Sequence, residues 1–329
     1  MLPEQKTPLV STVENSYTRW ISYHIAVVFI TLVALVVQFV VGWRQALDGL
    51  VITALAAVIA VGLIALVRLL LGLEVIGYRH YMHVLTKALL VALLLPVGAP
   101  LYIVPVTMLI MLIIDRLFKW IFHKAIVHPV LFAVLTVHAV FGGHMVVSET
   151  MINIFGEASF ELGPLQLLLG TYEGLTFGST AFLVLGVLWV YMAVTKIVQF
   201  RMSIWYLANM TLAVVAFALL TDYSWWGLFS RLLLGYTLFM LVFFVAEPTS
   251  TPETDEMMTL YPVVAVGFTV WLRLAFGMVE AAIYALVFAQ FATWVIEQFL
   301  NRTSVERTRI IYGGTAFLWI VLVVALVLV

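Results

Sequence analysis

The sequence contains no cysteine and few charged residues, and each scarcity excludes classes of protein. Without cysteine the chain cannot form disulfides, ligate an iron–sulfur cluster through thiolates or attach a c-type haem. Charged residues make up 10% of the 329 residues and hydrophobic residues 64%, whereas a soluble globular chain has about 25% charged residues. A formal net charge of -1 provides no basic surface for nucleic acid. These values predict a polytopic membrane protein whose main surroundings are the lipid bilayer.

Long apolar runs recur along the chain. About 20 apolar residues are needed to cross the roughly 30 Å hydrocarbon core of a bilayer as a helix. The sequence predicts an all-α fold with eleven spans, ten or twelve being the alternatives, at residues 21–42, 49–71, 84–98, 101–118, 127–147, 174–195, 203–221, 227–246, 259–277, 279–299 and 309–329. The third and fourth are either two short helices or one span that is broken within the membrane at residues 96–100.

The basic residues predict the orientation of these spans. With the N-terminus in the cytoplasm, thirteen Lys and Arg residues fall on the cytoplasmic side, and only Arg44, Arg231 and Arg273 fall outside. Cytoplasmic loops carry an excess of Lys and Arg. We therefore expect a multi-pass protein of the cell (inner) membrane with a cytoplasmic N-terminus.

Several motifs occur in an order that is found in one family of membrane subunits. In chain order they are LLVALLLPVGAPLYIVPVT at 89–107, DRLFKWIFHKAIVHPVLFAVL at 115–135, Gly178-Ser179-Thr180, Phe200-Arg201, AEPTSTPETD at 246–255, the stretch from Arg273 to Glu280, and residues 284–290. Their layout resembles the family shared by the NqrB protein of the sodium-pumping NADH:quinone reductase and the RnfD protein of the Rnf electron-transport complex. The resemblance extends over about residues 20–300.

The resemblance implies two inverted five-helix repeats, an arrangement common in transporters, plus an extra C-terminal helix. The corresponding divisions are a cytoplasmic tail at 1–19, a first half at 20–147, an acidic outer loop at 148–173, a second half at 174–300, and a basic loop with the additional helix at 301–329. The implied function is passing electrons from a cytoplasmic NAD(P)H or ferredoxin reductase subunit or domain to a membrane or outer acceptor such as quinone. Coupled Na⁺ or H⁺ translocation is part of what the family implies.

The resemblance also implies a flavin, FMN or riboflavin. Many members carry FMN as a phosphoester on the threonine of an SGATPL-type motif. Here Gly163 stands at that position, within Phe160-Glu161-Leu162-Gly163-Pro164-Leu165, and glycine has no hydroxyl to esterify. We therefore expect any flavin to be bound non-covalently.

The candidate cofactor-binding residues form three groups. Gly178, Ser179 and Thr180 open an apolar helix, where free amides and hydroxyls suit an anion such as a flavin phosphate; plain N-capping explains them equally well. Arg273 and Glu280 flank Gly277, and charges within a membrane usually serve function, although each could extend to the interface instead.

The third candidate is His128, which replaces the asparagine of the family's NPA motif. His128 and His138 are ten residues apart, close to three helical turns, so they share one face of a helix. Two haems would require paired axial histidines on facing helices. No second histidine that could complete such a pair near the outer side of the membrane is evident. Hydrogen-bonded core histidines are therefore favoured over haem, and neither a metal site nor a catalytic residue is predicted.

The same features also allow a second class of function. Inverted repeats, a broken span and a central Arg–Glu pair suit a membrane transporter or channel for a small solute as well as they suit electron transfer.

The predicted orientation can be tested by cysteine labelling, because the chain has no native cysteine. An impermeant thiol reagent is expected to label Glu253→Cys only from the cytoplasmic side and Glu157→Cys only from outside. Labelling of Glu253→Cys from outside would overturn the orientation.

Overall fold

The structure is a computed structural model, and it describes residues 9–70, 72, 78–96, 98–142, 163–169, 176, 178, 182–220, 236–247, 252, 254–278, 280–302 and 313–314. Every regular element within these residues is a helix. The predicted last span, 309–329, lies outside the described residues apart from 313–314, and so does most of the predicted outer loop.

The first part of the chain contains five helices. They are α1 (Leu9–Val41), α2 (Trp43–Leu70), α3 (Tyr78–Leu94), α4 (Ile103–Phe122) and α5 (Pro129–Phe141). Residues 95–102 separate α3 from α4 as a turn, with the amides of Ala99 and Ile103 donating to the carbonyls of Pro96 and Pro100 at 3.0 and 2.9 Å. The helical run is thus broken in this region, as both alternatives require.

The second part of the chain is also helical. Its elements are α7 (Pro164–Leu169), α8 (Phe182–Val194), α9 (Phe200–Leu220), α11 (Tyr236–Met240), the π-helix η2 (Leu241–Val245) that continues α11, α12 (Asp255–Phe276) and α13 (Ala281–Arg302).

Five of these helices are long and apolar enough to cross a membrane by length and composition. They are Thr18–Val41, Trp43–Leu70, Phe200–Leu219, Asp255–Phe276 and Ala281–Phe299, and shorter apolar helices occur at Tyr81–Leu94, Pro129–Phe141 and Phe182–Val194. Their outward faces carry large apolar side chains, such as Val58 at 70% exposure, as a lipid-facing surface requires. The chain is a multi-pass membrane protein.

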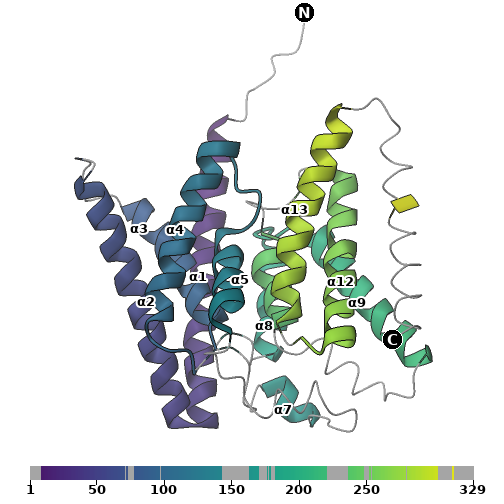
Figure 1. The fold of residues 1–329 in the computed structure, drawn as a ribbon, viewed down its shortest axis with the longest axis horizontal. Coiled ribbons are helices and arrows are strands. Elements are labelled where there is room, and N and C mark those ends of the chain that lie inside the picture. Colours follow the sequence, from purple (N-terminus) through teal and green to yellow (C-terminus); the bar gives the residue numbers. More distant parts are fainter. Residues whose placement is uncertain are drawn as a thin grey trace, which may run out of the picture.

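Two groups of helices lie side by side in Figure 1, with α5 and α8 between them. On one side α1 packs on α2 and α3, and α2 packs on α3 and α4; on the other, α12 packs on α9 and α13. The two groups are joined where α5 contacts α13 and where α1 contacts α8.

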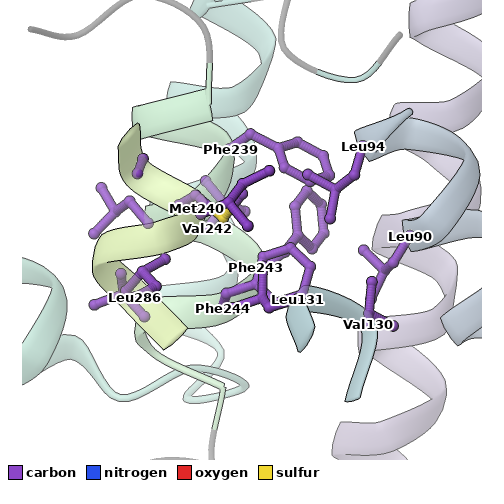
Figure 2. Close-up of a cluster of buried hydrophobic side chains, with 14 of the residues drawn as sticks. Leu90, Leu94, Val130, Leu131, Phe239, Met240, Val242, Phe243, Phe244 and Leu286 are labelled. Atoms are coloured by element: carbon purple, nitrogen blue, oxygen red, sulfur yellow. The ribbon is translucent and has the colours of Figure 1, made fainter. Parts of the chain in front are cut away.

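The interior between the groups is filled by apolar side chains. Figure 2 shows Phe239, Phe243 and Phe244 facing Leu94 of α3 and Leu131 of α5. All five are fully buried. Such close packing is typical of a protein interior.

Candidate functional site

Two polar contacts join α5 to α13 across the centre of the bundle. The backbone N–H of His128, just before α5, donates to Oε1 of Gln290 at 2.9 Å. Nδ1 of His138 lies 3.9 Å from Oε1 of Glu280, which stands just before α13. Each contact joins the residue just before one helix to a side chain nine residues beyond the first residue of the other. The two contacts are therefore reciprocal, as expected for helices that pack antiparallel.

His128 is enclosed by the neighbouring π-helix. Its residue is 3% exposed, and its ring meets that of Phe244 edge-on, with the centroids 4.8 Å apart. Gln290 continues the polar contact, since its Nε2 donates to the hydroxyl of Tyr261 on α12 at 3.4 Å. His128 thus lies in the packed centre and positions the start of α5.

A left-handed glycine turn brings Arg273 and Glu280 to the same end of α12 and α13. Gly277 ends α12 with φ 62°, and its N–H donates to the carbonyl of Arg273 at 3.0 Å. Arg273 is 3% exposed and interacts electrostatically with Tyr206 of α9 and with Glu280. A guanidinium enclosed in this way is shielded by the surrounding helices, so the arrangement is that of a buried charge.

Glu280 lies between the two spans and is partly buried, with 19% of its side chain exposed. Burial raises the pKa of its carboxyl above the ordinary value of 4.5, while its own backbone N–H and the charge of Arg273 oppose this rise. At the same turn Nε2 of His138 is buried, and among the described residues it has no hydrogen-bond partner. The turn therefore presents donors and a proton-binding carboxyl together.

Gly178 lies where the chain crosses between α3 and α11. Its N–H donates to the carbonyl of Leu93 at 2.8 Å, and a Cβ at this position would lie 2.8 Å from Cβ of Leu93 and 2.9 Å from Cε2 of Phe239. The amide of Gly178 is therefore engaged by the protein itself. Ser179 and Thr180, the other members of the predicted anion site, lie outside the described residues.

Three polar residues with buried contacts were not among the predicted site residues. Gln290 contacts His128, and Tyr206 interacts with Arg273; both lie within apolar helices. Lys87 of α3 forms a separate ion pair with Asp115 on α4. The available signal for Gln290 was its position ten residues after Glu280, the same interval that separates His128 from His138.

Apolar helices of spanning length, with a buried arginine and a partly buried glutamate at the α12–α13 turn, define a multi-pass α-helical membrane protein. The chain belongs to the NQR2, RnfD, RnfE family, which it matches over residues 7–306. This confirms the resemblance found in the motifs, and it places the chain among the membrane subunits of multi-subunit complexes. No curated protein sequence matches the chain.

The raised pKa of Glu280 predicts a defined pH dependence of stability. Because the folded-state pKa lies above 4.5, the folded protein binds this proton more tightly than the unfolded chain does. The resulting stabilisation is fully present below pH 4.5 and is lost as the pH rises through the folded-state pKa. Glu280→Gln, which stays neutral, is expected to remove this loss in thermal unfolding of the detergent-solubilised protein between pH 4.5 and 7.

Glu256→Gln, at the other end of α12, is the matched control and is expected to leave the pH dependence of the wild type intact. A Glu280→Gln protein whose stability falls with pH as steeply as the wild type's would contradict the buried state of Glu280.

The close approach at Gly178 predicts that even one methyl group is too large there. Gly178→Ala is expected to lower the free energy of unfolding by about 1–3 kcal/mol, the usual cost of overpacking. Gly186→Ala is the control, because Gly186 lies in α8 and no neighbouring atom comes within 4 Å of the place that the added methyl group would occupy. That variant is expected to be neutral or up to about 1 kcal/mol more stable, and equal effects at the two positions would refute the close packing.

Proposed function

We propose that the chain is the integral-membrane electron-transfer subunit of a complex similar to the Nqr and Rnf complexes. The observation that supports this most is the family match, which extends over residues 7–306 of 329. In this function a partner subunit or domain oxidises NAD(P)H or ferredoxin in the cytoplasm. The chain then passes electrons to a membrane or outer acceptor, such as quinone, with coupled movement of Na⁺ or H⁺.

We infer that the chain is built of two inverted halves, α1–α5 and α8–α13. The packing supports this inference, because equivalent pairs of helices contact each other in both halves: α4·α5 and α12·α13, α2·α4 and α9·α12, α3·α5 and α11·α13. The reciprocal contacts of His128 with Gln290 and of His138 with Glu280 fit the same two-fold relation. An odd number of spans in each half would invert the second half relative to the first.

A flavin fits the described residues at the turn between α12 and α13 better than at Gly178. The single amide of Gly178 already donates to Leu93, whereas the buried guanidinium of Arg273 carries several N–H donors suited to carbonyl or phosphate oxygens. Nε2 of His138 is a buried ring nitrogen with no hydrogen-bond partner among the described residues. We propose that these two residues hold the flavin and that Glu280 sets the local charge. The flavin would supply the one- and two-electron chemistry, while the protein supplies position and electrostatics.

The covalent mode of binding does not fit the chain. Gly163 offers no hydroxyl, and its backbone N–H donates to Oε1 of Gln166 at 3.2 Å.

Solute transport is the alternative function, and the packing of the centre favours electron transfer over it. A solute pathway needs polar groups along its length. In Figure 2 the labelled residues of α3, α5, α11, η2 and α13 are instead buried aromatic and aliphatic side chains, and the polar contacts of α5 with α13 lie beside them. Electrons can tunnel through such a medium without a pore. The visible absorbance spectrum of the purified protein tests the two functions: oxidised-flavin bands support the first, and a colourless preparation that binds a solute supports the second.

Denaturation tests how the flavin is held. We expect flavin fluorescence to leave the protein in SDS and to be absent from the protein band of the gel, because Gly163 cannot form a phosphoester. Arg273→Gln is expected to reduce the flavin that co-purifies severalfold, since a buried charge-assisted hydrogen bond is lost.

Arg201→Gln is the matched control, because Arg201 pairs with the exposed Asp255 at the surface. It should retain flavin at the wild-type level. A fluorescent band that survives SDS would contradict non-covalent binding, and unchanged flavin in Arg273→Gln would remove this residue from the site.

A further inference from the structure

A groove of about 860 Å³ opens between α2, α3 and α4, away from the α12–α13 turn. Its wall includes Leu109 and Ile113 of α4, which are 50% and 54% exposed and therefore face the acyl chains of the membrane. Its volume lies within the range of small-molecule sites. The groove is thus apolar and opens on the lipid-facing surface.

Basic side chains converge at one end of this groove. Arg116 and Lys119 lie one and two turns beyond Ile113 toward the end of α4, and Arg68 lies in the last turn of α2. Trp120, also in the lining, is 78% exposed, as tryptophans at the membrane–water interface are. The groove is therefore apolar along its depth and basic where it reaches the interface.

The single carboxylate of the lining does not neutralise this end. Asp115 accepts from Nζ of Lys87 at 2.6 Å and from Nζ of Lys119 at 2.8 Å, so its charge is shared by two cations. Lys87 is 8% exposed and is not part of the groove wall. Arg116, the residue after Asp115, is also in the lining. Among the described residues, Lys87, Lys119 and Arg116 therefore outnumber the one carboxylate at this end.

We propose that this groove is a binding site for a membrane lipid with an anionic phosphate headgroup. The phosphate lies against Arg116, Lys119 and Arg68, and an acyl chain lies along Leu109 and Ile113. Basic residues near helix C-termini also complement the helix dipole, but a dipole does not require three of them to surround one apolar groove. Basic pockets between membrane helices on the cytoplasmic side are typical sites for anionic lipid headgroups.

Lipid binding to the full-length protein, purified in detergent, tests the proposal by native mass spectrometry. Dioleoyl-phosphatidylglycerol is expected to bind in preference to dioleoyl-phosphatidylcholine, which has the same acyl chains. Arg116→Gln is expected to weaken phosphatidylglycerol binding about fivefold, the factor for one basic residue near an anionic surface. Lys196→Gln, an exposed lysine between α8 and α9, is the matched control and should bind as the wild type does.

A second variant distinguishes a lipid from a free phosphate. Ile113→Trp fills the apolar part of the groove without changing its charge, and thermal unfolding verifies that the exposed position tolerates it. Loss of phosphatidylglycerol binding in both Ile113→Trp and Arg116→Gln supports the lipid site. The proposal is overturned by equal binding of the two lipids, by equal losses in Arg116→Gln and Lys196→Gln, or by competition from inorganic phosphate combined with full binding in Ile113→Trp.

Discussion

The centre of the bundle depends on giving buried backbone amides a hydrogen-bond partner, and the hydrogen bond from His128 to Gln290 does so at the start of α5. The first amides of a helix have no partner within that helix, and inside a membrane no water replaces the partner. Proline at position 129 removes one such amide at the start of α5, and Oε1 of Gln290 accepts from the amide of His128. Because the acceptor belongs to α13, satisfying this amide also fixes the two parts of the chain against each other.

The same constraint explains the distribution of charge. Among the described residues, one group of buried charge is Arg273 and Glu280 at the α12–α13 turn, and another is Lys87 and Asp115 between α3 and α4. Glu247 and Glu297 are buried as well. The apolar cluster of Figure 2 lies between the two groups of helices. In these two groups of charge each member has a compensating neighbour, which a low-dielectric interior requires. The proposed flavin and lipid sites use these two concentrations of charge for different ligands.

Several helices could be predicted from the sequence because their apolar length sets them. The predicted span at 279–299 corresponds to α13, and the predicted span at 203–221 corresponds to α9. The partners within the site could not be predicted, because they depend on contacts between residues far apart in the chain. Nothing near Gly178 in the sequence indicates that Leu93 and Phe239 approach it, and the burial of Arg273 depends on how α9 packs against α12.

The distance along the chain between His128 and Gln290 has a consequence for biosynthesis. The two residues are 162 positions apart. The hydroxyl of Tyr23 likewise donates at 2.9 Å to the carbonyl of Phe243 in the π-helix, 220 positions away. At about 5–20 residues per second, ribosomes need roughly 8–32 s to make the 162 residues. Throughout that interval α5 has been synthesised but its acceptor has not. The nascent first half is therefore expected to be an obligate client of the insertion machinery, which must shield the start of α5 until α13 arrives.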